Sequence, residues 1–289
     1  MNKKGLIIIN GYGVAEGIQH QVKRLQEEFL KRNAIVDVLT STDVFSYLKE
    51  GDVVVTLPEY DFVVYTDKDR YIAEELEKRG YRLFNRAESI IKCDDKMLTH
   101  LALSDNGIRM PTTISSPLCY RDNQNRNYLD KIIKIIGLPM IVKENYGSLG
   151  RQVYYVETKD ELLNLENKLI HVPHIFQQFI KSSKGKDYRL IVIGGKVVAH
   201  MKRENKHSYL SNLATGGKSS VVDLSEKYFE VAEKAANILG LDYCGVDLLE
   251  GPDGEPILSE VNSNAFYEGI EKTTGINVAR LYVDYILSK

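Results

Sequence analysis

The sequence predicts an α/β protein in which an N-terminal open parallel sheet is followed by smaller lobes of mixed α+β structure. Apolar runs of strand length alternate with helical patterns as far as Asn85, and from Met110 onward this alternation stops. Two glycine-containing turns, Gly194-Gly195 and Gly251–Glu255, each separate a pair of apolar runs. Alternating strands and helices are typical of a parallel sheet, whose ligands bind at the carboxyl ends of its strands.

The N-terminal elements follow from hydrophobic periodicity. The expected order is strand Leu6–Asn10, helix Ile18–Arg32, strand Ile35–Thr40, strand Asp61–Thr66, helix Asp69–Arg79 and a short strand Tyr81–Asn85. The glycines Gly11, Gly13 and Gly17 approach a dinucleotide-binding fingerprint, but their spacing is one residue too long. They leave open a nicotinamide-dependent oxidoreductase, an anion bound at the helix start, a substrate contact or a plain turn.

The next helix is expected to open with a capping-box pattern at Asn85–Glu88 and to continue through Leu103. It ends at Asn106-Gly107, because glycine is favoured just after a helix C-terminus. Lys96 lies on this helix, and by itself it reads as a solvated charge.

A glycine-containing loop is the first candidate binding element. A helix and two strands are expected at Leu129–Ile136, Met140–Lys143 and Gln152–Val156. The loop between the two strands contains Gly147, Ser148 and Gly150, and Lys143 precedes it. Backbone N–H groups of such a loop can surround phosphates, while the lysine supplies a positive charge. The alternative is a long hairpin loop without a ligand.

The following region contains two patterns that resemble known binding motifs, a phosphate-binding loop and a pair of histidines, and neither is interpreted as a binding site. We expect a strand end at Phe176–Phe179, a hairpin of Leu190–Ile193 and Lys196–Met201, and helices Glu226–Gly240 and Val278–Leu287. Residues 212–219 imitate a phosphate-binding P-loop, but Asn212 stands where the motif requires glycine and no strand directly precedes it. His171 and His174 have no neighbouring carboxylate or cysteine, which argues against a metal site there.

The last hairpin carries a candidate metal site. With Asp253 and Gly254 as the two central residues of a tight turn, Asp247 lies opposite Glu260. Asn262 lies on the same face, two residues further along the strand. Two carboxylates directly opposite each other repel, and oxygen ligands of this kind suit Mg²⁺ bound together with phosphate oxygens. The alternative is a solvated hairpin face with a chance acidic pair.

Composition excludes several classes of protein. The 289 residues carry a formal net charge of −2, which gives no overall attraction to nucleic acid or to membranes. The three cysteines lie far apart, without the spacing of a zinc site or a disulfide framework. The apolar runs are too short for a signal sequence or a membrane span, so we expect a cytoplasmic protein.

From residue 85 to the end, an ordered series of motifs resembles the ATP-grasp superfamily and, within it, the RimK-like branch. The motifs are GIRMPTT (107–113), GLPMIVK (137–143), FQQFI (176–180), KGKDYRLIVIGGKVVAHMKR (184–203), SNLATGG (211–217), GVDLL (245–249) and SEVNSNAFYEGIEKTTGI (259–276). The resemblance implies an ATP-grasp fold with three lobes. They are a Rossmann-like lobe at 1–92, a central lid lobe at 93–181 and a C-terminal lobe with an antiparallel sheet and the magnesium site at 182–289.

The resemblance also implies roles for individual residues. ATP would be bound by Lys96, Lys143, Gly147, Ser148, Gly150, Gln177, Gln178, Phe179, Ile180 and Asp187. The ligands of Mg²⁺, with Mn²⁺ as an alternative metal, would be Asp247, Glu260 and Asn262. Charge on the transferred phosphoryl group would be stabilised by Arg203, Lys143 and Arg189. The substrate would be faced by Ser211, Asn212, Asn264 and Gly269.

The implied activity is the ATP-dependent ligation of a carboxylate and an amine. The carboxylate attacks the γ-phosphate of ATP to give ADP and an acyl-phosphate, which the amine converts into an amide and phosphate. The expected partners are an amino acid, such as glutamate, and a carboxylate on a small molecule, peptide or protein. A homo-oligomer is also expected. A nucleotide-binding module without catalysis is the alternative.

Three positions depart from the family pattern. Gln178 stands where many members have an acidic residue, and Leu210 stands where they often have a basic one. The step Asn264-Ala265-Phe266 replaces a common Ser-Pro-Gly. These departures put glutamate as substrate in question and indicate a changed acceptor pocket.

Overall fold

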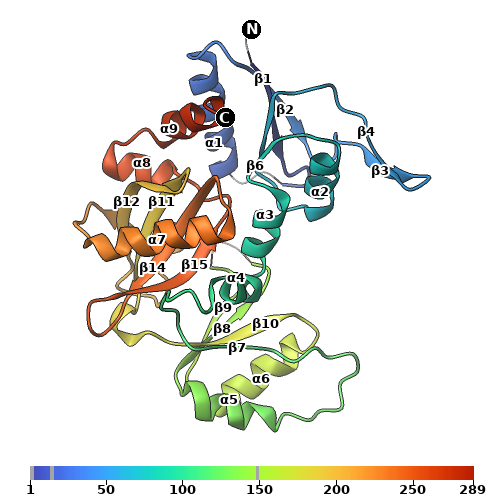
Figure 1. The fold of residues 1–289 in the computed structure, drawn as a ribbon. Helices are drawn as coiled ribbons and strands as arrows, with labels where there is room; N and C mark the ends of the chain where they lie inside the picture. The colour runs from blue at the N-terminus through green and yellow to red at the C-terminus, as the bar shows by residue number, and fades with distance from the viewer. Residues whose placement is uncertain (1–2, 14–15, 148–149) are drawn as a thin grey trace.

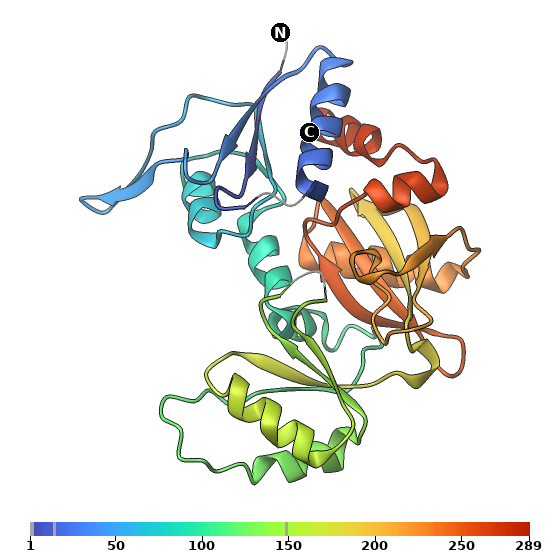
Figure 2. The same ribbon diagram turned by 180° about the vertical axis from the view of Figure 1, so that it is seen from behind.

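The computed structural model describes residues 3–13, 16–147 and 150–289. A parallel sheet lies at one end of the molecule, a five-stranded antiparallel sheet in the middle and a four-stranded antiparallel sheet at the other end (Figure 1). Figure 2 shows the same arrangement from behind. Among the described helices, none combines the length and the apolar character needed to cross a membrane.

The N-terminal sheet is parallel, as predicted, with the strand order β2-β1-β5-β6. Its strands are β1 (Lys4–Ile9), β2 (Ile35–Thr40), β5 (Phe62–Tyr65) and β6 (Leu83–Phe84). Helices α1 (Glu16–Leu30) and α2 (Arg70–Lys78) cover opposite faces. Successive residues of a strand point to opposite faces, and accordingly Ile7 packs in the cluster of α1 while Leu6 and Ile8 pack in that of α2.

A β-hairpin that the sequence did not predict projects from this end of the molecule (Figure 1). It consists of β3 (Ser46–Lys49) and β4 (Asp52–Val55). Its side chains are exposed or half-buried. The hairpin therefore lacks the alternation of buried and exposed residues by which a strand is predicted from sequence.

The long helix predicted through Leu103 is in fact two helices, α3 (Ala87–Asp94) and α4 (Lys96–Leu103). Asp95 separates them: its backbone is extended, and its side chain accepts hydrogen bonds from two N–H groups at the start of α4. The predicted capping box is wrong. Arg86 is the N-cap of α3 and makes no side-chain cap bond, while Asn85 bonds instead to the backbone of Tyr243 and Ser263.

The four-stranded sheet is antiparallel, in the order β7-β10-β8-β9. Its strands are β7 (Thr113–Ser115), β8 (Met140–Glu144), β9 (Val153–Val156) and β10 (His174–Gln178). The predicted α5 (Tyr128–Ile136) and the unpredicted α6 (Lys159–Leu169) cover one face. Met140 and Val142 of β8 point into the core beneath these helices, so Ile141 and Lys143 point to the other face.

The five-stranded sheet is also antiparallel and has the order β13-β12-β11-β14-β15. Its strands are β11 (Lys186–Ile193), β12 (Lys196–Glu204), β13 (Lys218–Ser220), β14 (Tyr243–Glu250) and β15 (Pro256–Asn262). Helix α7 (Glu226–Leu239) covers one face. The remaining helical segments are α8 (Glu268–Thr274), α9 (Val278–Leu287) and the 3₁₀ turns η1 (Lys181–Ser183) and η2 (Leu213–Thr215).

The hairpin of β14 and β15 differs from its prediction at the turn but not at the candidate site. The strands end at Glu250 and Pro256, so the connection is longer than the two-residue turn expected at Asp253-Gly254. This shifts the pairing near the turn by one residue. A β-bulge at Ser259 shifts it back, and Asp247 therefore pairs with Glu260 as predicted.

Candidate functional site

A cavity of about 840 Å³ lies where the three large sheets meet. Its walls come from the carboxyl ends of β1 and β5, from β8 and the loop after it, and from the face of the five-stranded sheet that α7 leaves uncovered. Every predicted site residue that the structure describes lines this cavity. Ser148 lies outside the described residues.

Strand alternation explains why polar residues gather on this face. In β11, Asp187 and Arg189 share a face with the apolar Ile191 and Ile193. The alternate residues of this strand point to the opposite face and pack under α7. The same face is thus polar at the cavity and apolar where it meets α1 and α9.

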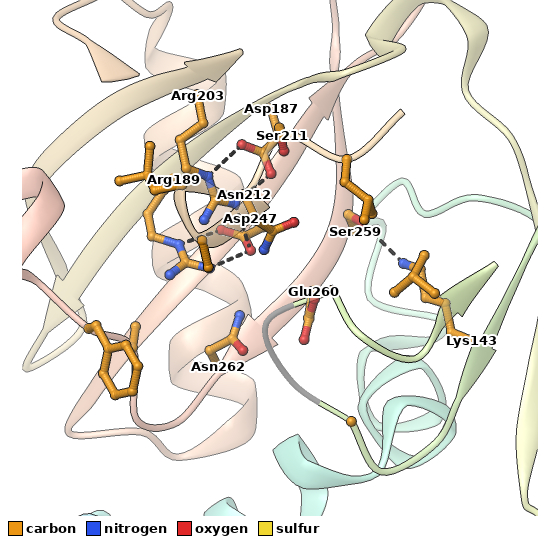
Figure 3. Close-up of a pocket in the computed structure, with 18 of the residues that line it drawn as sticks. Lys143, Asp187, Arg189, Arg203, Ser211, Asn212, Asp247, Ser259, Glu260 and Asn262 are labelled. Carbon is orange, nitrogen blue, oxygen red and sulfur yellow. Dashed lines mark hydrogen bonds and ion pairs between the residues drawn. The ribbon is translucent and has the colours of Figure 1, made fainter. Parts of the chain in front are cut away.

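Two arginines and two aspartates form an ion-pair cluster at the centre of the cavity (Figure 3). Asp187 pairs across the strands with Arg203, and Arg189 pairs with Asp247. Arg189 donates from Nε and Nη2 to the two Asp247 oxygens, at 2.6 Å each. Arg203 donates to both Asp187 oxygens at 2.7 and 2.5 Å, and its Nη2 also lies 3.0 Å from Asp247 Oδ2. Asp247 is therefore held by two guanidinium groups.

The cluster favours the charged forms of Asp247 and Arg203. Burial opposes ionisation of Asp247, but the charges of Arg189 and Arg203 outweigh it and lower the pKa of Asp247. Burial likewise opposes the positive charge of Arg203, and Asp187 and Asp247 outweigh it, so the pKa of Arg203 is raised. Asp247 and Arg203 thus stabilise each other's charge inside the cavity.

Glu260 and Asn262 complete the predicted metal-ligand set. Among the described residues the Glu260 side chain makes no hydrogen bond or ion pair, and the side-chain nitrogen of Asn262 is buried without a partner. Two carboxylates and one amide fit Mg²⁺, which takes few protein ligands and fills its remaining positions with phosphate oxygens and water. The part of the chain that is described contains no group of three or more His, Cys, Asp or Glu side chains placed to hold a metal by themselves.

Two buried lysines line the cavity on another wall. Lys143 of β8 has its Nζ 3.5 Å from the Ser259 hydroxyl, at the bulge next to Glu260 (Figure 3). Burial lowers the pKa of Lys143, although Glu260 acts in the opposite direction. Lys96, the first residue of α4, donates from Nζ to the carbonyl oxygens of Asn145 and Gly147 at 3.4 and 3.2 Å. Lys96 therefore contacts the start of the glycine-containing loop directly.

The predicted adenine-side residues are the last two residues of β10, Gln177 and Gln178, and the next two along the chain, Phe179 and Ile180. Gln177 is buried, and its Nε2 lies 3.0 Å both from Thr113 Oγ1 and from Nε2 of His100. Burial, with a smaller effect of Lys143, lowers the pKa of His100 to about 4, so His100 is neutral at pH 7 and its Nε2 can accept this hydrogen bond. Gln178 is exposed and accepts from the Thr112 N–H at 3.3 Å.

The predicted substrate residues lie on different walls of the cavity: Asn212 lies near Gly150 of the glycine-containing loop, and Asn264 contacts the N-terminal sheet. Ser211 is buried at the cavity wall, and Gly269 lies in the first turn of α8. The Asn264 amide donates to the Thr66 carbonyl at 2.6 Å and accepts from Gln21 at 3.2 Å, so it links the C-terminal segment to the N-terminal sheet.

Phe266 lies against Gly17, where a Cβ atom would come within 2.7 Å of the phenyl ring. This contact gives the glycine a packing role. Helix α1 begins at Glu16, whose negative charge opposes a phosphate at this helix start.

The sequence prediction missed several apolar residues of the cavity, including Ile141, Leu249 and Met201. Ile141, Leu249 and Met201 each stand two positions from a predicted site residue (Lys143, Asp247 and Arg203). Strand alternation places residues two apart on one face, so this rule would have found all three.

A family model described as the RimK-like ATP-grasp domain matches residues 93–286. The chain belongs to the RimK-like ATP-grasp family. It is 33% identical over 260 residues to beta-citrylglutamate synthase B of Danio rerio, covering 87% of this chain and 63% of that protein. It is 32% identical over 283 residues to a probable alpha-L-glutamate ligase of Psychromonas ingrahamii, covering 92% and 91%.

The RimK-like chain spans less than two thirds of the length of the synthase that it matches, whereas it spans nearly all of the bacterial relative. Its fold is that of ATP-grasp ligases. It superposes with a TM-score of 0.71 on the ATP-grasp ligase PsnB complexed with minimal precursor, Mg and ADP, at 16% identity, covering 98% of this chain and 97% of that one.

Proposed function

We propose that this chain is an ATP-dependent carboxylate–amine ligase that forms an amide through an acyl-phosphate and releases ADP and phosphate. The observation that carries this proposal is the content of one cavity. Lys96, Lys143 and the two arginines face Glu260 and Asn262 there, close to the glycine-containing loop. Phosphoryl transfer needs mainly such positioning and charge neutralisation.

The proposed roles follow from these contacts. Lys143 and the loop held by Lys96 bind the nucleotide phosphates, and Gln177 to Ile180 line the adenine side. Asp247, Glu260 and Asn262 hold Mg²⁺, for which Mn²⁺ is an alternative, and the metal when bound neutralises phosphate charge. Arg203 and Arg189 stabilise the negative charge of the transferred phosphoryl group and of the acyl-phosphate.

The proposed substrates are an amino acid and a carboxylate-bearing small molecule, peptide or protein. Glutamate is the first amino acid to test, because it occurs in the names of both relatives. The departures at Leu210 and Phe266, which both line the cavity, are reasons to test other amino acids as well. The expected homo-oligomer and cytoplasmic location remain predictions.

The test is an assay with purified protein, ATP, Mg²⁺ and pools of carboxylates and amino acids, in which ADP is measured and amide products are detected by mass spectrometry. We expect ADP formation that depends on both pools, together with a new amide. Absence of both products, or the same products from an Asp247→Ala variant, would contradict the proposal.

A further inference from the structure

Asp67 is a buried carboxylate of the cavity to which the proposed reaction assigns no role. It follows β5 and is 7% exposed. The neighbouring Lys68 pairs with Asp94 at 2.5 Å instead, and among residues 3–13, 16–147 and 150–289 Asp67 has no ion pair. A buried charge without a counter-charge is costly, so a cationic ligand would bind favourably here.

Asn10 holds this carboxylate in place. Its Nδ2 lies 3.2 and 3.3 Å from the two Asp67 oxygens, and its own carbonyl oxygen accepts from the Tyr12 N–H at 2.9 Å, which sets the direction of the amide. The Lys68 N–H donates to Asp67 Oδ1 at 2.7 Å. A carboxylate offers about four lone-pair positions, and these donors occupy three, which leaves room for one further donor.

The location in the fold also indicates a ligand site. In the order β2-β1-β5-β6, the chain moves from β1 to one side for β2 and to the other side for β5. Ligands of open parallel sheets bind at the carboxyl ends of the strands where the order reverses in this way. Asn10 directly follows β1, and Asp67 lies two residues after the end of β5. Both line the same cavity as Glu260 and Arg203.

We propose that Asp67, held by Asn10, binds the protonated amine of the amino-acid substrate. This inference rests on the proposed ligase function. A metal ion is a poorer fit, because one carboxylate whose neighbour donates an N–H lacks the several oxygen ligands that a cation such as Ca²⁺ or Mg²⁺ requires. An ammonium group, in contrast, brings N–H donors to the remaining carboxylate position.

The test measures binding, so it does not depend on turnover. The full-length protein saturated with Mg²⁺ and ADP is titrated by calorimetry with each of the common amino acids, and then with the 2-hydroxy acid of the same side chain. The hydroxy acid has nearly the same size but no positive charge. We expect at least one amino acid to bind, and its hydroxy acid to bind at least about tenfold more weakly, a difference of about 1.4 kcal/mol.

The matched variants are Asp67→Asn and Asp43→Asn. Asp67→Asn should weaken the binding of the amino acid at least tenfold and should leave the affinity for Mg²⁺ and ADP unchanged. The unchanged affinity also shows that the variant is folded. Asp43 is an exposed carboxylate of the same sheet region outside the cavity, so Asp43→Asn should change neither affinity.

Three results would overturn the inference: no amino acid binds the wild type, the hydroxy acid binds equally well, or Asp67→Asn binds the amino acid as tightly as the wild type. Amide formation by both the wild type and Asp67→Asn with the same KM for the amino acid would overturn the inference but leave the ligase function standing. Failure of the wild type to form any amide would instead contradict the ligase function.

Discussion

Asp247 and Glu260 lie directly opposite each other, yet their surroundings differ sharply. Asp247 accepts hydrogen bonds from Arg189 and Arg203, whereas Glu260 has no such partner among the described residues. Directly opposed carboxylates repel, and the arginines relieve this repulsion from one side only. Asp247 therefore contributes to the fold as well as to the site, while Glu260 is the carboxylate available to a ligand.

The first prediction separates these two roles. Glu260→Gln removes a charge that makes no ion pair and acts only at a distance on Lys143, so its free energy of unfolding should fall by no more than about 1 kcal/mol. Its affinity for Mg²⁺ and ADP should fall about tenfold or more. Asp247→Asn breaks the buried pairs of Arg189 and Arg203 and should cost about 3–5 kcal/mol.

Urea unfolding and calorimetric titration with Mg²⁺ and ADP measure both variants. Equal destabilisation by Glu260→Gln and Asp247→Asn would show that this division of roles is wrong.

The residues of the site could be predicted only where they belong to a local sequence pattern or to a motif of the family. Asp247, Glu260 and Asn262 came from the alternation of one hairpin, which short-range spacing determines. Asp67 and Asn10 are separated by 57 positions, and only the parallel pairing of β1 with β5 brings them together. No local periodicity encodes such a contact.

At the scale of elements, the break between α3 and α4 positions the glycine-containing loop. Asp95 caps α4 and also accepts a hydrogen bond from the Asn145 amide at 3.0 Å. Asn145 directly follows β8, and its backbone carbonyl accepts from Lys96. One carboxylate thus orients both the start of a helix and the start of the loop.

The second prediction concerns this cap. Asp95→Ala removes the acceptor and should lower the free energy of unfolding by about 1 kcal/mol. It should also speed hydrogen exchange in residues 144–147, because the loop loses a restraint. Asp95→Asn keeps a side-chain oxygen that can cap the helix and should behave nearly as wild type in both measurements. Unchanged exchange in Asp95→Ala would contradict the link to the loop.

The third prediction concerns the junction of α1 with α9, where Glu28 is 1% exposed. Burial raises the pKa of Glu28, but hydrogen bonds from Lys31, Asn277 and Arg32 outweigh it and lower the pKa to about 2. The ordinary value is near 4.5. Ionised Glu28 therefore contributes stability that is fully present above about pH 4.5 and is lost as the pH falls toward 2, about 3 kcal/mol in total.

Urea unfolding at pH 7 and at pH 3 measures this contribution. In Glu28→Gln the stability difference between the two pH values should be about 2 kcal/mol smaller than in the wild type, whereas Glu27→Gln, on the exposed side of the same helix, should keep the wild-type difference. The assignment fails if Glu28→Gln shows the pH dependence of the wild type.

The elements that sequence reading predicted well are those with a strong apolar period, such as α9, for which both ends were correct. The hairpin β3–β4 and helix α6 were missed, because an exposed hairpin and a charge-rich helix carry little periodic signal. The bulge at Ser259 could not be read from the sequence, since it depends on a turn whose length tertiary packing determines.

At the scale of the molecule, the N-terminal sheet and the five-stranded sheet share a hydrophobic core. Phe29 of α1 and Ile7 of β1 belong to the same cluster as Ile191 of β11, Tyr243 of β14 and Tyr282 of α9. The four-stranded sheet has a core of its own, beneath α5 and α6. The alternation of strands and helices predicted the N-terminal sheet, and the hairpin turns predicted antiparallel strands further along the chain. Neither pattern predicted which sheets share a core, because that depends on how α9 returns to the N-terminal end (Figure 1).

The last prediction follows from this division. Tyr282 is 2% exposed, stacks on Tyr243 with ring centroids 4.7 Å apart and donates to the Phe84 carbonyl at 3.3 Å. Tyr282→Ala should cost about 3–5 kcal/mol and should reduce the hydrogen-exchange protection of β1 and β14 together, because both rest on one core. Leu162→Ala, in the separate core of the four-stranded sheet, should reduce protection in β8 and β10 while β1 stays protected.

Exchange measured by mass spectrometry on peptides from these strands distinguishes the two patterns. Loss of protection in β14 without β1 after Tyr282→Ala would mean that the two sheets open independently. In that case the cavity between them could widen without unfolding, and the subsite at Asp67 could move relative to the ion-pair cluster. Joint loss would instead mean that the distance between amine and phosphoryl subsites is set by the shared core.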